Sequence, residues 1–369
     1  MDIKDYYLKA LATNRFSEND VFPIILGLYG ETGSLMSAIK KLKREQNTYM
    51  YFNEIVKEEL GDILWYFSML CGYLDCNIEK VFSECYSKTD LSNVILTTNS
   101  IHPVAFSSSS KSIGNLDKAL FGLAKAASKF FEEKECQKIN QEDLSHFAFA
   151  YLECVRESKI PLLEIAQKNL DKTYDRFIRL ENQKLPRFDK DFPVYERIPE
   201  EFSIKIIQLS NGKTRMSWND VFIGDPLSDN ISNSDGYRYH DVFHFGFAAI
   251  LHWSPTFRAL IKRKRKSKKE IDEAQDSGRA IVVEEGLSAW IFAQAKKLNF
   301  FKDQNQISYD ILKVIRQFVD GYEVEKVPLA LWEHAILESY KVFRELKKHE
   351  GGIIECSKEN REIKFISHS

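Results

Sequence analysis

Three acidic residues at helical spacing are the first candidates for chemistry. Glu59 and Asp62 stand three residues apart in the segment EELGDILWY (58–66), and Glu31 stands in GLYGETGSL (27–35). Residues three apart on a helix share one face. Apolar residues recur at helical spacing around both segments, so two helices that pack by their apolar faces would bring these three carboxylates together.

Carboxylates crowded beside a hydrophobic core repel one another and are costly to bury. A hard divalent cation removes this cost, and Mg²⁺ accepts a few carboxylates while it keeps waters and substrate phosphates. The alternative is that the acids cap helices or lie on a solvated helix face. Two acidic clusters, each beside a glycine in an otherwise apolar segment, favour the metal site.

The remaining pattern predicts the elements that must position these residues. Asn211-Gly212 predicts a tight hairpin between strands at 203–210 and 213–218. Three prolines in the charged run 185–199 predict a linker. We therefore expect a mainly α protein with a helical bundle at 1–187 and a second, mostly helical domain at 188–369 that starts with a small β-hairpin. Helical periodicity predicts helices over 20–43, 54–74, 116–133, 141–157, 161–181, 237–251, 255–262, 278–298, 308–320 and 329–348.

Composition narrows the class of protein. The 369 residues include 52 Lys and Arg against 54 Asp and Glu, which argues against binding to nucleic acid or to an anionic membrane. The first residues lack the basic and then apolar order of a signal peptide, and the most apolar stretch, 63–74, is too short to span a bilayer. Six cysteines without a CxxC pair predict reduced thiols. We expect a cytoplasmic protein with no membrane partner.

The two acidic segments resemble the MazG-like family of all-α nucleoside-triphosphate pyrophosphohydrolases, whose signature is ExxE in one helix and ExxD in the next. A third piece agrees, because Asn169, Lys172 and Arg176 stand at the spacing of the NxxKxxxR pattern that often ends this domain. The resemblance covers roughly residues 1–180. It implies a helical bundle that cuts a nucleoside triphosphate, with ribose or deoxyribose, between its α and β phosphates, and releases a monophosphate and pyrophosphate.

The resemblance also implies roles for individual residues. Glu31, Glu59 and Asp62 would hold Mg²⁺, for which Mn²⁺ is a possible substitute, and Glu58 would act beside Glu59 as general base. The family often completes its site between subunits, so a homo-oligomer, dimer or tetramer, is expected. The residues expected to neutralise or hold the phosphates are Lys168, Asn169, Lys172, Arg176, Lys40 and Lys41.

The sequence departs from the family pattern at Ser34, which stands where ExxE has its second glutamate. A serine is a poorer ligand for a metal, so the site would hold fewer ions unless Glu58, Glu54 or a water compensates. Two functions stay open as a result. The protein hydrolyses nucleoside triphosphates, or it senses nucleotides with a weakened site and signals through its C-terminal domain.

A second cluster lies in the C-terminal half. His240 and His244 are four residues apart on a predicted helix, and Glu284 and Glu285 stand near the start of the next long one. Histidine with carboxylate suits Zn²⁺ or another transition ion. The alternatives are a buried polar network and an HD-type phosphohydrolase around His240-Asp241, which lacks the further histidine and aspartate that such a site needs. The sequence of this half is similar to that of a C-terminal domain found fused to MazG-like domains.

Two further patterns belong to the C-terminal half. The segment 281–290 shares an apolar pair, an acidic pair and a tryptophan with 55–65, so this half is either a diverged relative of the first or a chance match between short helices. Seven of the eight residues in 262–269 are basic, which predicts a site that steers phosphates or a solvated helix end. No aromatic residue interrupts this run, so specific nucleic-acid binding is not expected.

Overall fold

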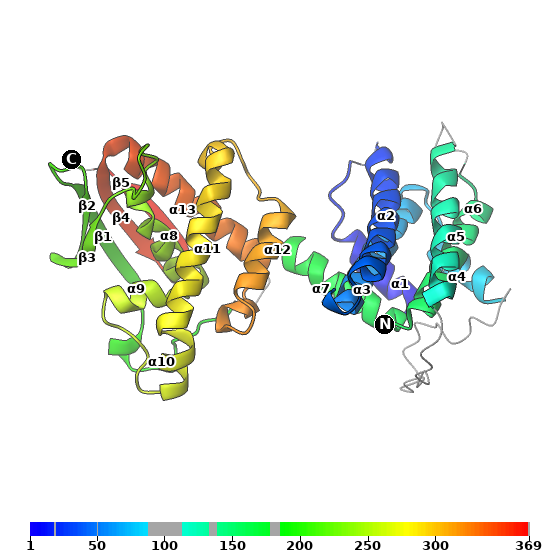
Figure 1. Ribbon diagram of the computed structural model, residues 1–369, viewed down its shortest axis with the longest axis horizontal. Coiled ribbons are helices and arrows are strands. Elements are labelled where there is room, and N and C mark those ends of the chain that lie inside the picture. The colour runs from blue at the N-terminus through cyan, green and yellow to red at the C-terminus, as the bar shows by residue number, and fades with distance from the viewer. Residues whose placement is uncertain (18–19, 50, 88–112, 133–138, 178–184, 368–369) are drawn as a thin grey trace. The chain divides into compact units, whose positions relative to one another are not determined.

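The computed structural model describes residues 1–17, 20–49, 51–87, 113–132, 139–177 and 185–367 (Figure 1). The chain forms two compact units, Met1–Ile178 and Arg179–Ser369, and each has its own hydrophobic core. Helices predominate, which confirms the prediction of a mainly α protein. Within the described ranges, no helix combines the length and the apolar character needed to cross a membrane.

The N-terminal unit consists of helices. Helix α2 packs along α3, α5 packs against α6, and α7 packs against α3. The start of α6 is well defined, because Asn140 and Asp143 form a reciprocal capping box there. The helices are α1 (Ile3–Leu11), α2 (Phe22–Glu45), α3 (Phe52–Tyr73), α4 (Ile78–Ser87), α5 (Ile113–Glu132), α6 (Gln141–Ser158) and α7 (Leu162–Phe177).

The C-terminal unit combines helices with one antiparallel sheet in the order β3-β2-β1-β4-β5. The predicted hairpin is confirmed as β1 and β2, which pair on either side of Asn211-Gly212. The structure adds three strands that the sequence pattern did not predict. The strands are β1 (Glu201–Gln208), β2 (Thr214–Trp218), β3 (Val221–Leu227), β4 (Gly351–Ser357) and β5 (Glu362–Ile366).

Helices α8 and α13 pack against β4 and β5 (Figure 1). Alternate residues of β1, Phe202, Ile204 and Ile206, are buried in the core, as expected for a sheet with one covered face. The predicted helix 237–251 is instead a short turn, then α8, then a π-helical segment at Phe247–Leu251. The helices of this unit are α8 (Asp241–Gly246), α9 (Pro255–Leu260), α10 (Lys269–Gln275), α11 (Gly278–Lys297), α12 (Tyr309–Phe318) and α13 (Leu329–His349).

The cysteines within the described ranges are free thiols, and Cys136 lies outside those ranges. Cys71, Cys85 and Cys154 are buried in helices, and Cys356 is buried in β4. Burial raises the pKa of the Cys154 thiol to about 12. These thiols therefore act as small apolar side chains in the two cores.

Candidate functional site

The N-terminal unit brings three carboxylates together between two packed helices. Glu31 projects from α2, and Glu59 and Asp62 project from α3. One carboxylate oxygen of each lies within 4.8 Å of the others. All three side chains are half-buried, so the cluster is open to solvent on one side. This is the convergence that helical spacing predicted.

Glycines allow the helices that carry the cluster to approach closely. A Cβ atom at Gly27 would lie 2.1 Å from the ring of Tyr66, and one at Gly61 would lie 2.9 Å from Cβ of Asn169. Larger residues at these two positions would push α2 and α7 away from α3. Gly27, one turn before Glu31, and Gly61, next to Asp62, therefore have a packing role that brings the polar groups of three helices to one place.

Burial, together with the crowding of like charges, raises the pKa of two of the carboxyls. The pKa of Glu59 is raised to about 8, first by burial and then by its hydrogen bond with Glu31 and the charges of Glu31, Asp62 and Glu58. Burial also raises the pKa of Asp62 to about 6, although the ammonium group of Lys172 opposes this. A carboxyl with a raised pKa releases its proton when a cation binds beside it. The oxygen donors and the excess of negative charge fit a hard divalent cation such as Mg²⁺.

Helix α7 closes the other side of the cluster with two of the predicted phosphate-binding residues. Nζ of Lys172 lies 3.0 Å from Oε1 of Glu58 and 2.5 Å from Oδ2 of Asp62. Asn169 donates from Nδ2 to Oδ1 of Asp62 at 3.0 Å. The oxygen of the same amide accepts from the hydroxyl of Tyr6 at 2.8 Å, which orients Asn169. Sequence reasoning missed Tyr6, and no local signal in α1 marks it.

The other predicted phosphate ligands are four basic residues on α2 and α7. Arg176 is half-buried on α7, and its charge opposes the effect of burial on the pKa of Tyr66. Lys40, Lys41 and Lys168 are exposed on their helices. Among the described residues, no hydrogen bond or ion pair joins these three lysines to the acidic cluster. Ser34 is half-buried on α2, one turn after Glu31.

The C-terminal unit brings the second predicted cluster together. Nitrogen atoms of His240 and His244 and a carboxylate oxygen of Glu285 lie within 4.8 Å of one another. Glu284 is fully buried and takes a different role, because its Oε1 accepts from Nδ1 of His244 at 2.8 Å. The two neighbouring glutamates of α11 therefore contact the two nitrogens of one imidazole.

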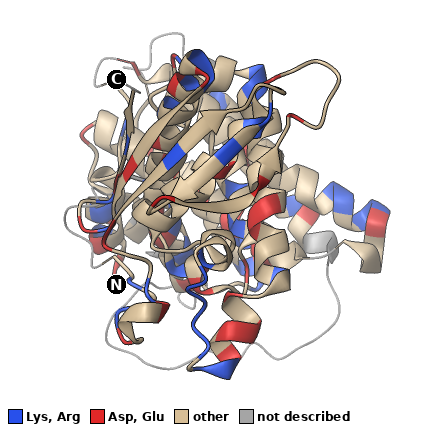
Figure 2. Cartoon of the chain, turned by 90° about the vertical axis from the view of Figure 1, so that its left-hand side faces the viewer, with Lys and Arg blue, Asp and Glu red and all other residues tan. Residues whose placement is uncertain are grey.

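Two arginines of the basic run 262–269 are engaged within the C-terminal unit, whereas Lys262, Lys266, Lys268 and Lys269 are exposed. Arg265 is buried and pairs with Asp276 and Glu323. Arg263 donates to the backbone oxygens of Val194 and Arg197. Figure 2 shows basic and acidic residues scattered over the ribbons, with one continuous basic stretch. The expectation of a phosphate-steering site thus fails for Arg263 and Arg265, which instead hold segments of this unit together.

Comparison with protein families matches both units. Residues 23–91 match the MazG nucleotide pyrophosphohydrolase domain, and residues 183–369 match the MazG C-terminal domain. Comparison with curated proteins and with solved structures gave no match. The first of these matched segments contains Glu31, Glu59 and Asp62, and the second spans more than half of the chain and contains the histidine cluster. The chain therefore belongs to the MazG family, with a nucleotide pyrophosphohydrolase domain followed by a MazG C-terminal domain.

Proposed function

We propose that this protein is a Mg²⁺-dependent nucleoside-triphosphate pyrophosphohydrolase, which releases a nucleoside monophosphate and pyrophosphate. The observation that carries the proposal is the meeting of three carboxylate oxygens from α2 and α3 within 4.8 Å. The match of residues 23–91 to a nucleotide pyrophosphohydrolase domain supports the class of reaction. Mn²⁺, which takes similar oxygen ligands, is expected to replace Mg²⁺.

The proposed roles follow from the contacts. Glu31, Glu59 and Asp62 would hold the ion, which supplies a Lewis acid for the phosphates and lowers the pKa of the attacking water. Glu58 would accept the proton of that water, beside Glu59. Lys172 stands 3.0 Å from Glu58 and 2.5 Å from Asp62, so its ammonium group can pass from these acids to the substrate phosphates. Asn169, held by Tyr6, keeps Asp62 oriented.

A homo-oligomer is part of the proposal. Phe22, Leu26 and Tyr29 are spaced at four and three residues along α2 and are 56%, 48% and 44% exposed. Three large apolar side chains on one exposed helix face favour burial against another subunit. Light scattering coupled to size-exclusion chromatography measures the mass directly, and a single 42.9 kDa species at micromolar concentration would contradict this part of the proposal.

The test is a turnover assay on the purified chain with the eight common ribo- and deoxyribonucleoside triphosphates. Pyrophosphate and orthophosphate are measured separately, with Mg²⁺, with Mn²⁺ and with excess chelator. We expect pyrophosphate release that needs the metal and falls by about 100-fold or more in Glu59→Gln. Glu79→Gln is the matched control, because Glu79 is a half-exposed glutamate on α4 that pairs only with Lys4 in the described structure.

Two other outcomes would replace the proposal. Tight nucleotide binding without release of either product would indicate a nucleotide sensor, the function that Ser34 leaves open. Release that persists in Glu59→Gln and disappears in His240→Ala would assign the activity to the C-terminal unit, as an HD-type phosphohydrolase requires.

A further inference from the structure

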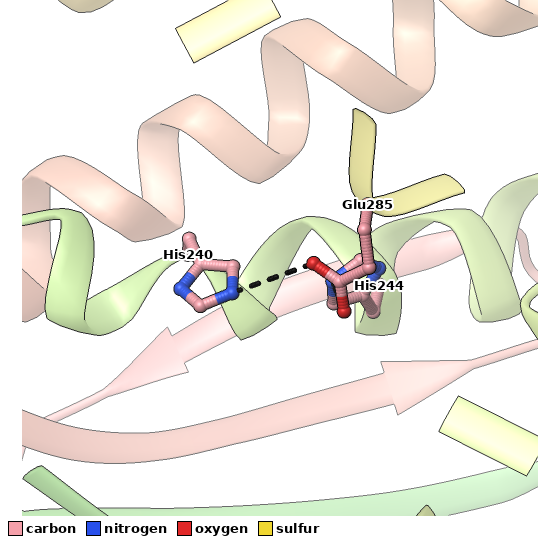
Figure 3. Close-up of side chains that lie close together, drawn as sticks. All are labelled: His240, His244 and Glu285. Atoms are coloured by element: carbon pink, nitrogen blue, oxygen red, sulfur yellow. Dashed lines mark ion pairs between the residues drawn. The ribbon is translucent and has the colours of Figure 1, made fainter. Parts of the chain in front are cut away.

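A cluster of imidazoles and carboxylates in the C-terminal unit lies outside the proposed hydrolase site. His240 precedes the first residue of helix α8, and His244 lies within that helix. Glu285 reaches both histidines from α11 (Figure 3). Nε2 of His244 lies 3.3 Å from Oε1 of Glu285, and Nε2 of His240 lies 3.7 Å from the other oxygen of that carboxylate. Oδ1 of Asp241 lies 3.7 Å from Nε2 of His240 and 3.9 Å from Nε2 of His244.

These separations match the spacing of ligand atoms around one ion. Two ligands that bind Zn²⁺ at about 2.1 Å with tetrahedral geometry are about 3.4 Å apart. The separations of 3.3 to 3.9 Å between the nitrogens and the carboxylate oxygens are of that size and need little movement to close on an ion. Two neutral imidazoles and two carboxylates would also balance the charge of a divalent cation.

The environment of the buried His244 side chain also indicates a ligand. It is fully buried, and among the described residues its Nε2 makes no hydrogen bond of good geometry, although Oε1 of Glu285 lies 3.3 Å away. Its Nδ1 lies 2.8 Å from Oε1 of Glu284, which also accepts from Oγ of Ser254, while Oε2 accepts from the backbone N–H of Thr256. A carboxylate that binds one imidazole nitrogen leaves the lone pair of the other nitrogen for a metal. A buried polar atom without a well-formed hydrogen bond is costly unless a ligand satisfies it.

His240 is held in a comparable way. Its Nδ1 lies 2.9 Å from the carbonyl oxygen of Tyr237, and its ring stacks on the ring of Tyr237 at 4.3 Å. The Nε2 atoms of both histidines are therefore directed at Glu285. The side chain of Glu285 is 38% exposed, so an ion has a route from solvent into the cluster.

The competing explanation is an ion-pair network in which a proton takes the place of the metal. The charges of Glu284 and Glu285 raise the pKa of His244 against the opposing effect of burial. A protonated His244 would donate from both nitrogens and lock α8 to α11. The two explanations differ in one observable, because only a metal site retains a stoichiometric ion.

We propose that His240, His244 and Glu285 bind one divalent transition-metal ion of the Zn²⁺ class, with Asp241 beside both imidazoles. Glu284 is a positioning residue that orients His244. The nitrogen donors separate this site from the all-oxygen cluster of the N-terminal unit, which suits Mg²⁺. The metal site does not depend on the proposed hydrolase activity.

The test measures metal content and affinity on the full-length protein. The chain is stripped with a chelator, titrated with Zn²⁺ or Co²⁺ in excess Mg²⁺, and analysed for bound metal by mass spectrometry and for Co²⁺ by its visible absorption. We expect one ion per chain, with Zn²⁺ displacing Co²⁺. His240→Ala and Glu285→Gln should each weaken binding at least about 10-fold, and Glu284→Gln by about 10- to 100-fold.

Controls separate this result from folding and from the other site. His349→Ala removes a 40% exposed histidine on α13 and should leave affinity unchanged. Glu59→Gln should also keep the ion, so loss of hydrolysis leaves this proposal standing. Circular dichroism checks that each variant is folded. Absence of a stoichiometric ion in the wild-type chain at micromolar Zn²⁺, or unchanged affinity in the His240 and Glu285 variants, would overturn the proposal.

Discussion

The ammonium group of Lys172 on α7 lies 2.5 Å from Oδ2 of Asp62 on α3. Both side chains are less than one-fifth exposed, so solvent screens this pair only in part. Lys172 would therefore lie next to a cation held by Glu31, Glu59 and Asp62. Under the proposed function, the same ammonium group would compete with the metal for Asp62 and would pair with the phosphates once the metal is bound.

Lys172→Met separates these two roles. Removal of the positive charge should let the acidic cluster bind Mg²⁺ several-fold more tightly in the absence of nucleotide. It should also lower kcat/KM by about 10- to 100-fold, because the phosphates lose a charged partner. Calorimetric titration with Mg²⁺ and steady-state kinetics give the two numbers. Lys125→Met on α5, where the lysine is exposed, is the control, and unchanged values in Lys172→Met would contradict both roles.

The contact between α3 and α7 depends on Gly61. An alanine there would place its Cβ 2.9 Å from Cβ of Asn169 and 3.3 Å from the carbonyl oxygen of Ile165. We expect Gly61→Ala to lower the free energy of unfolding by about 1–3 kcal/mol and to reduce turnover, because α7 must move away from Asp62.

Urea unfolding followed by circular dichroism measures the change. Gly122→Ala on α5 is the matched control, since a Cβ at Gly122 would meet no described atom within 4 Å. It should instead stabilise the helix by about 0.5–1 kcal/mol. A Gly61→Ala protein as stable as the wild type would mean that the two helices do not approach so closely.

Helix phase explains why the first site was predictable. Glu59 and Asp62 share a face through their spacing, and the apolar stripe beside them directs that face towards α2. Tyr6 was not predictable, because its contact with Asn169 joins residues 163 apart and depends on how α1 packs. The different roles of Glu284 and Glu285 depend in the same way on the orientation of α11 against α8.

The sheet shows a second limit of sequence reasoning. The Asn211-Gly212 signal is local and gave β1 and β2 correctly. Gly351 and Gly352 follow the last helix closely and begin β4. A Cβ at Gly351 would lie 2.6 Å from the carbonyl oxygen of Ile206, so this glycine allows β4 to pair closely with β1. Strand pairing between residues so far apart in the chain has no local signature.

Ser34→Glu tests the departure from the family pattern. Residue 34 lies one turn after Glu31 on α2, so a glutamate there would add a fourth carboxylate on the same face. We expect the Mg²⁺ concentration for half-maximal turnover to fall several-fold, because the ion gains a negatively charged ligand. Ser34→Gln has the same size without the charge and should not show this effect. Equal Mg²⁺ requirements in both variants would mean that residue 34 does not reach the ion.

His252 makes the stability of the C-terminal unit sensitive to acid. Its side chain is fully buried beside the carbonyl oxygen of Lys358, and burial together with the nearby Arg361 lowers its pKa to about 3. In the unfolded chain the pKa of histidine is about 6.5, so the unfolded state binds the proton first as the pH falls. This contribution is therefore complete above about pH 6.5, declines as the pH falls, and is lost by about pH 3. Between pH 7 and pH 5 the loss is about 2 kcal/mol.

His252→Asn should remove this acid sensitivity. Asparagine tolerates the left-handed backbone at this position, where φ is 60°, and it does not titrate. Urea unfolding at pH 7 and at pH 5, followed through the fluorescence of the buried Trp253 and Trp332, gives the free energy of unfolding of each protein. The difference between the two pH values should be smaller by about 2 kcal/mol in the variant. The exposed His349, changed to Asn, should leave that difference as in the wild type. If His252→Asn also left the difference between pH 7 and pH 5 unchanged, His252 would not be held neutral in the folded chain.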